Sequence, residues 1–210
     1  AEAERVMRIL TAVLKFRACR DNIRVATGAM EVRGGNGYIE DWVNSRLIRD
    51  AHIGVLWEGT SNINALDVIN RAVAKSGGHE TLGRALKAKL SAATAAPAAF
   101  RAEISKLVDR AVAFAGEVAA KPKHERLARL ATDALYNVAS AALMTWEGAT
   151  AGVNGQDARR MILARMVVEH RLRAEDPLEI PASDWEEDAT AALLDPAPVS
   201  LDRAVEIVSA

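Results

Sequence analysis

Apolar residues recur every three or four positions along most of this chain, and this helical spacing is what most constrains its fold. The first stripe predicts a long helix that runs to about Arg33 and stops at Gly34 and Gly35. Its members are Val6, Ile9, Leu10, Val13, Phe16, Ile23, Ala26 and Met30. No run of alternating β-branched residues, typical of strands, occurs anywhere in the chain. The sequence therefore predicts an all-α protein whose helices pack as bundles.

Further helices are expected after the glycine pair. The predicted ranges are a short helix near 43–50, one from 60 or 61 to before 77, one over 80–95, one over 124–149 and one ending at 174. Another helix is expected between the break at Pro97 and its end at Lys121-Pro122, with its apolar stripe over 104–111. Thr60 or Ser61 is expected to cap the second of these helices. Beyond Pro177 we expect a surface strap, in which Ser183 and Glu186 form a capping box for a short helix.

Composition excludes several classes of protein. The chain has 210 residues, of which 50% are hydrophobic and 26% charged, and its formal net charge is -1. These values argue against a disordered chain and against a nucleic-acid binder with a basic surface all round. Cys19 is the single cysteine, so no intrachain disulfide is possible and a cytoplasmic location is expected. We also expect no membrane span, because no apolar run is long enough to cross a bilayer. A piece of a longer protein is expected, because the chain opens at Ala1 inside a helical pattern.

Local composition divides the chain into three parts. We expect a motif-rich part over 1–78, a helical extension over 79–175 and an acidic tail over 176–210 with one or two short helices. Basic residues outnumber acidic ones between Arg84 and Arg129, whereas acids stand without Lys or Arg from Glu175 to Asp195. The basic and acidic stretches are therefore candidates for pairing with each other.

Three motifs follow one another in the first part of the chain. Alone, the glycine-rich motif is an ordinary helix stop, and a Glu before Gly-Thr is an ordinary first-turn residue. In this order they resemble, over residues 3–75, the C-terminal helical domain of the acyl-CoA dehydrogenase flavoproteins. The motifs are Ala29-Met30-Glu31-Val32-Arg33-Gly34-Gly35-Asn36-Gly37-Tyr38, Arg49-Asp50-Ala51 and Trp57-Glu58-Gly59-Thr60. The amino-acid sequence from Trp57 to Asp67 resembles the bacterial alkylation-response (DNA-damage) branch of that family most.

The resemblance implies a catalytic role for Glu58. In the family, this glutamate removes the α-proton of an acyl-CoA thioester while the β-hydrogen leaves as hydride to flavin N5. A carboxylate suits this task when the acyl chain excludes water and raises its pKa. The resemblance also implies that the thioester oxygen is bonded by the Glu58 N–H and a flavin ribityl hydroxyl, and that Gly59 lets the substrate approach closely.

The resemblance further implies an FAD cofactor, an oligomer and an electron acceptor. Thr60 and Asn62 stand where the family touches FAD. Gly34 and Gly35 stand where it contacts the FAD of a neighbouring subunit, which implies a homodimer or homotetramer. Glu31, next to this turn, takes a position where the family often has Gln. Electron-transfer flavoprotein is the expected reoxidant.

The sequence is compatible with three functions. The first is the C-terminal fragment of an acyl-CoA dehydrogenase, inactive when isolated because the upstream flavin-binding domains are absent. The second is an alkylation-response flavoprotein whose main task is DNA binding, with Arg84, Lys87 and Lys89 on one helix as phosphate contacts. The third is a helical oligomerisation module with a vestigial site. The acyl chain length and branching are not fixed by these residues.

Several other side chains have ordinary interpretations. Arg49 and Asp50 form a surface ion pair or brace the segment that leads to Glu58, and we prefer bracing. Trp57 is expected to pack in the core more than to wall an acyl pocket. Cys19 is expected to be a small core residue. No metal site is expected, because the four histidines lack ligand spacing.

Overall fold

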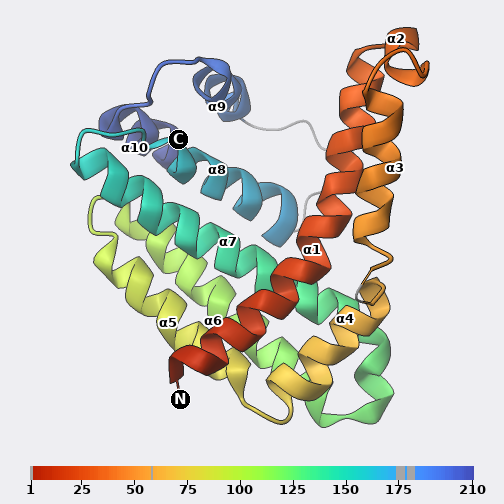
Figure 1. The fold of residues 1–210 in the computed structure, drawn as a ribbon. Helices are drawn as coiled ribbons and strands as arrows, with labels where there is room; N and C mark the ends of the chain where they lie inside the picture. Colours follow the sequence, from red (N-terminus) through yellow and green to blue (C-terminus); the bar gives the residue numbers. More distant parts are fainter. Residues whose placement is uncertain (1, 58, 174–177, 179–182) are drawn as a thin grey trace. The chain divides into compact units, whose positions relative to one another are not determined.

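The computed structural model describes residues 2–57, 59–173, 178 and 183–210. Within these ranges the chain forms helices, turns and loops but no strand, which confirms the all-α prediction. The chain divides into two compact units, coloured along the sequence in Figure 1. Unit 1 comprises Ala1–His79 and Ala115–Tyr136, and unit 2 comprises Glu80–Phe114 and Asn137–Ala210. The domain limits predicted at residues 78 and 175 stay a prediction.

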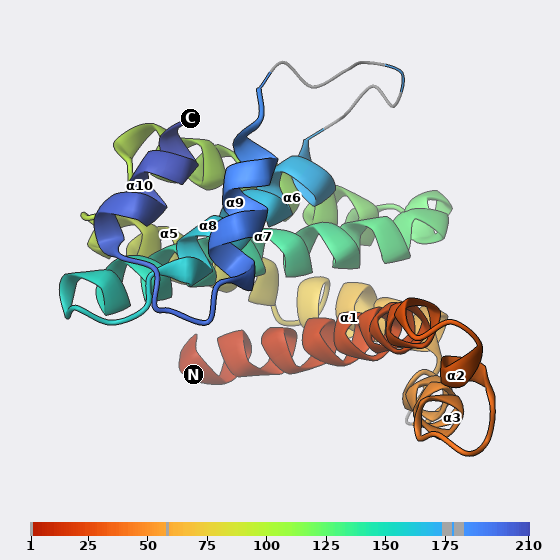
Figure 2. The ribbon, with the colours of Figure 1, turned by 90° about the horizontal axis from the view of Figure 1, so that it is seen from above.

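Unit 1 is organised around one long helix. Its elements are α1 (Glu2–Val32), α2 (Gly35–Tyr38), α3 (Asn44–Gly54), α4 (Ser61–Asp67), the π-helical η1 (Val68–Val73), the end of α6 (Ala98–Ala120), the 3-10 helix η2 (Pro122–Leu127) and the start of α7 (Ala128–Val153). α3 lies alongside the C-terminal half of α1 (Figure 1, Figure 2). The Lys15 ammonium donates to the carbonyl of Gly54 at 2.9 Å and so fastens the end of α3 to α1.

The predicted stripe on the first helix is confirmed. Ile9, Val13 and Phe16 are buried, and the other members are half-buried. The helix ends at Val32, one residue before Arg33. Gly34 follows with a φ of 57°, an angle that residues with a Cβ disfavour. Cys19 is half-buried rather than part of the core.

The helix that follows the third motif begins as predicted but is capped differently. Thr60 occupies the N-cap position of α4, yet its side chain makes no capping hydrogen bond. Ser61 is turned toward α1 instead, where its hydroxyl accepts from Arg20 at 2.9 Å. Ile63, predicted to belong to the buried stripe, is 58% exposed, while Ile69 and Val73 are buried. The prediction of a side-chain cap at Thr60 or Ser61 is therefore wrong.

Unit 2 is a second helical bundle. It contains α5 (Gly78–Ala92) from Glu80 on, α6 up to Phe114, α7 from Asn137, α8 (Arg159–Val167), the π-helical η3 (Val168–Leu172), α9 (Trp185–Leu194) and α10 (Leu201–Ser209). α7 and α8 approach closely at Gly148, where an added Cβ would lie 2.5 Å from the backbone nitrogen of Met161. The helices predicted over 80–95 and after Pro97 are confirmed as α5 and α6, and the one over 124–149 corresponds to η2 and α7, which cross from unit 1 into unit 2. The helix predicted to run to Ala174 ends earlier, at Leu172, because Arg173 is extended, and Ala174 lies outside the described residues.

The end of the chain is packed rather than draped over the surface. Trp185 and Ala189 of α9 and Ile207 of α10 are buried. The Arg165 guanidinium stacks 3.9 Å from the centroid of the Trp185 ring and donates to the carbonyl of Ile207. The prediction of a surface strap is therefore wrong for α9 and α10, because their apolar faces pack in unit 2.

The capping box predicted at Ser183 is also wrong. The N-cap residue of α9 is Asp184, and it makes no side-chain capping bond. A side-chain cap occurs one helix later, where Ser200 accepts from the backbone N–H of Arg203 at 3.3 Å.

Several charged side chains pair within their own stretch of the chain. Lys87 pairs with Asp109 at 2.8 Å and Lys121 with Glu117 at 3.1 Å, all within the basic stretch. In the tail, Asp188 pairs with Arg203 at 2.9 Å. In these pairs the acid and the base come from nearby segments, so they differ from the expected pairing between the basic stretch and the acidic tail. No helix in the described part of the chain is long and apolar enough to cross a bilayer.

Candidate functional site

The glycine-rich motif forms an open turn at the end of α1. Positions where a Cβ would be added to Gly34 or Gly35 have no atom within 4 Å, so the backbone there is accessible. Gly37 differs, because a Cβ would lie 2.2 Å from the carbonyl oxygen of Met30. Gly37 is thus required for packing against α1, a role that the sequence alone did not reveal, whereas Gly34 and Gly35 leave room for a ligand.

The second motif braces the loop that follows this turn. The Arg49 guanidinium binds both carboxylate oxygens of Glu40, at 2.8 and 3.2 Å, and Ser45 donates to the same carboxylate. These hydrogen bonds, that of Arg49 first, lower the pKa of Glu40. Asp50 lies 3.6 Å from Arg46. The ion-pair alternative for Arg49 and Asp50 is therefore wrong, since each pairs with another residue, and Arg49 fastens the loop between α2 and α3.

The third motif places a glycine in a special conformation at the start of α4. Glu58, the predicted base, lies outside the described residues. Gly59 has a φ of 96°, and a Cβ there would lie 3.1 Å from the Cγ2 of Ile63. The Asn64 amide donates to the Gly59 carbonyl at 2.7 Å and fixes this conformation. Trp57 is 69% exposed, so the expected core packing of its indole is wrong.

A group of charged residues lies behind the start of α4. Arg20 donates to Ser61, and Arg17, one turn earlier on α1, pairs with Asp133 of α7 at 2.6 Å. Burial, then the charges of Arg129 and Arg17, lower the pKa of Arg20. Sequence inspection missed these residues, because nothing in a helical stripe indicates which polar positions meet a distant segment.

The residues predicted to hold FAD are accessible. Glu31, Gly34, Gly35, Thr60 and Asn62 are all exposed. The open glycines suit close approach by a phosphate or ribose, and Thr60 and Asn62 offer side chains that donate. The exposed Glu31 carboxylate accepts only, so it does not fit beside a pyrophosphate. Four of the five residues thus fit a bound FAD.

These residues form two groups within one chain. Ser61, at the start of α4, contacts α1 at Arg20, whereas the glycine turn follows Val32. Val32 lies twelve positions after Arg20 on the same helix, which is about 18 Å along the axis at 1.5 Å per residue. The fold therefore does not bring Gly34 and Gly35 to the start of α4 in the same chain.

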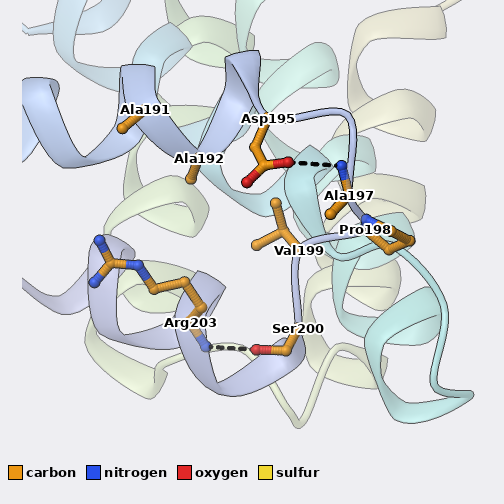
Figure 3. Close-up of a pocket in the computed structure, with 8 residues that line it drawn as sticks. All are labelled: Ala191, Ala192, Asp195, Ala197, Pro198, Val199, Ser200 and Arg203. Atoms are coloured by element: carbon orange, nitrogen blue, oxygen red, sulfur yellow. Dashed lines mark hydrogen bonds between the residues drawn. The ribbon is translucent and has the colours of Figure 1, made fainter.

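A separate hollow lies between α9 and α10 (Figure 3). It is lined mostly by small apolar side chains, and Asp195 and Ser200 bond to backbone N–H groups at its rim. The Arg203 guanidinium is held by Asp188 and Glu206. Among the described residues, no group of three or more His, Cys, Asp or Glu side chains gathers as metal ligands would.

Known proteins resemble the first third of the chain. A family model for the acyl-CoA dehydrogenase C-terminal domain matches residues 1–74. Acyl-CoA dehydrogenase family member 11 of Caenorhabditis elegans is 39% identical over 64 residues, which cover 30% of this chain and 10% of that protein. Putative acyl-CoA dehydrogenase AidB of Escherichia coli is 36% identical over 78 residues, 37% of this chain and 14% of AidB.

A third relative is similar to this chain over a segment of comparable length. The 3-methylmercaptopropionyl-CoA dehydrogenase of Ruegeria pomeroyi is 33% identical over 78 residues, 37% of this chain and 13% of that enzyme. The matches thus span 10 to 14% of the length of these relatives. No solved structure matches the chain. Residues 1–74 thus match the acyl-CoA dehydrogenase C-terminal domain family, and this match agrees with their three motifs and all-α fold.

Proposed function

We propose that this chain is the C-terminal part of an FAD-dependent acyl-CoA dehydrogenase that forms an α,β double bond in an acyl-CoA thioester. The observation that carries the proposal is the start of α4. There Gly59 adopts a conformation that favours glycine, directly after Glu58, within a segment that matches the family. A bare backbone beside a carboxylate is what close approach of a thioester requires.

Glu58 acts as the base in this proposal. Its carboxylate removes the α-proton, and the acyl chain that covers it excludes water and raises its pKa toward the working pH. The Glu58 N–H donates to the thioester oxygen and stabilises the negative charge that develops there. Gly59, without a side chain, leaves space for the thioester. FAD, when bound, supplies the acceptor for the β-hydride, and electron-transfer flavoprotein is the proposed reoxidant.

The cofactor contacts imply an assembly. Thr60 and Asn62 are proposed to hold the FAD next to Glu58, while Gly34 and Gly35 contact the FAD of a neighbouring subunit. The separation of the two groups along α1 supports this division, because one chain alone does not unite them. A homodimer or homotetramer is the proposed state, and the isolated chain is proposed to be inactive.

The flavin spectrum of the full-length protein tests this function. Anaerobic addition of acyl-CoAs of graded chain length should bleach the flavin absorbance. Glu58→Gln should abolish bleaching while FAD stays bound, and Asp41→Asn, which changes an exposed loop carboxylate, should bleach like the unchanged protein. Bleaching that survives Glu58→Gln would exclude Glu58 as the base.

The resemblance of the Trp57–Asp67 segment to the alkylation-response branch motivates a second candidate, a flavoprotein whose main task is binding DNA. Its proposed phosphate contacts are partly engaged in unit 2, since Lys87 pairs with Asp109 and the Lys89 ammonium lies 3.4 Å from the centroid of the Trp146 ring. Duplex affinity that does not depend on salt would exclude it. Flavin binding without turnover on any thioester would instead support a helical module with a vestigial site.

A further inference from the structure

We infer that a segment outside the family match positions the start of α4: the hairpin tip, residues 115–136, acts on Ser61 through Arg17 and Arg20 of α1. The tip consists of the end of α6, η2 and the start of α7. It belongs to the same compact unit as residues 1–79, although the match to the family model ends at residue 74. The catalytic consequence of this inference rests on the proposed function of Glu58.

The first link fastens the tip to α1. The Arg17 guanidinium contacts Asp133 at 2.6 Å and Asp21 at 2.9 Å, and its side chain is only 12% exposed. A guanidinium held by two carboxylates in a largely buried position has little freedom to move. Asp133 thereby fixes the start of α7 against this stretch of α1.

The second link reaches α4. Arg20 lies one turn beyond Arg17, on the same side of α1, and its Nη1 donates to the hydroxyl of Ser61 at 2.9 Å. Ser61 follows Glu58 by three residues. The hydrogen bond therefore ties α1 to the start of α4, which follows the proposed base in the sequence.

The electrostatic setting of Arg20 is unusual. Its described hydrogen bond goes to a hydroxyl rather than to a carboxylate. Arg17 and Arg129 add positive charge nearby, and the charges of Asp133 and Asp21 oppose this effect. Burial and the two arginine charges lower the pKa of Arg20. Arg20 stays protonated because an arginine titrates far above neutral pH. A fixed cation thus sits behind the first residue of α4, and the tip contributes Arg129 to its surroundings.

This arrangement makes Arg20 a positioning residue with two separable effects. Its hydrogen bond holds the start of α4 in place, and its charge favours an ionised carboxylate nearby. Loss of the bond should slow proton removal and loosen α4. Loss of the charge should in addition raise the pKa of the Glu58 carboxyl, which a purely structural role would not do.

Three variants of the full-length protein separate these effects. Arg20→Lys keeps the charge but loses the fork geometry, and Arg20→Gln loses both. Arg24→Gln, one turn further on α1 and exposed, is the matched control. Two measurements are made: the pH dependence of anaerobic flavin bleaching and amide hydrogen exchange of residues 59–67.

The expected results differ between variants. Both Arg20 variants should slow bleaching, by about tenfold or more if the base is displaced by a fraction of an ångström. Only Arg20→Gln should move the pH midpoint upward. Both Arg20 variants should speed amide hydrogen exchange in residues 59–67. Asp133→Asn, which releases the tip from α1, should do the same. Arg24→Gln should match the unchanged protein in every measurement.

The outcomes keep the two proposals distinct. The positioning role would be overturned if Arg20→Gln left both measurements unchanged: the amide hydrogen exchange of residues 59–67 and the pH midpoint of flavin bleaching. Faster exchange confined to the tip in Asp133→Asn would overturn the link from the tip to α4. Bleaching that survives Glu58→Gln, or no bleaching of the unchanged protein, would reject the proposed function, while the exchange measurement would still decide the contact.

Discussion

Arg17 and Asp133 stand 116 residues apart in the chain and meet at 2.6 Å in unit 1. This contact joins α1, inside the family match, to the start of α7, outside it. Burial opposes the charge of Arg17, but Asp133 and Asp21 outweigh that effect and raise its pKa. The part of the chain beyond residue 78 is therefore not a mere appendage, because a piece of it completes the first compact unit.

Loss of this ion pair should destabilise the protein. Asp133→Ala leaves a largely buried guanidinium with one acid fewer, and Asp133 itself is 32% exposed. We therefore expect a loss of about 1–2 kcal/mol in the free energy of unfolding, between the values for exposed and buried ion pairs. Urea unfolding measures it. Asp109→Ala, which breaks the exposed pair with Lys87, is the control and should cost about 0.5 kcal/mol or less. Equal effects of the two changes would contradict the importance of the buried pair.

Two glycine substitutions should have opposite effects. Gly148→Ala forces a Cβ to 2.5 Å from the backbone of Met161 and pushes α7 and α8 apart. We expect a loss of about 2 kcal/mol or more. Gly28→Ala, in the interior of α1 with no atom near the new Cβ, should stabilise by about 0.5–1 kcal/mol through reduced freedom of the unfolded chain. Thermal unfolding distinguishes them, and a stabilising Gly148→Ala would refute the close contact.

The contact of Lys89 with Trp146 predicts a stability effect without a DNA effect. Lys89→Met keeps the apolar stem but removes the ammonium that lies 3.4 Å from the ring centroid, which should cost about 0.5–1 kcal/mol. Lys106→Met, on exposed α6 surface, is the control. If Lys89 binds phosphate instead, the slope of log affinity for duplex DNA against log salt should fall by about 1. An unchanged slope is expected.

Asp157 should make unit 2 sensitive to acid. Burial opposes its charge, but the backbone N–H groups of Arg159 and Val199 and the Arg159 guanidinium outweigh this and lower the pKa of Asp157. Because the folded pKa lies below the unfolded value of about 3.9, the stabilisation is complete above that pH and is lost as the pH falls through the folded value.

Asp157→Asn tests this pH dependence, since it keeps an acceptor for the two N–H groups but removes the charge. Its urea midpoint should lie below that of the unchanged protein at pH 5–7, and the gap should close as the pH falls below about 4. Asp41→Asn is the control. A gap that is the same at every pH would show that the charge of Asp157 does not contribute.

Much of the fold was predictable from local patterns. The stripe from Val6 to Met30 predicted α1, and Gly34 predicted its end, because burial of one face and a conformation suited to glycine are properties of neighbouring residues. Caps were predicted poorly. Ser61 was a sound candidate on sequence grounds, but its hydroxyl meets Arg20, which lies 41 residues earlier.

The sequence by itself determined the helical class and the order of the three motifs, and with them the similarity of residues 1–74 to the acyl-CoA dehydrogenase C-terminal domain family. Only the tertiary structure decided that the hairpin tip belongs with α1, that Arg49 holds Glu40, and that Gly37 packs against Met30. The physical reason is range. Helix periodicity and glycine conformations act between near neighbours, whereas ion pairs such as Arg17–Asp133 depend on which distant surfaces come together when the apolar faces are buried.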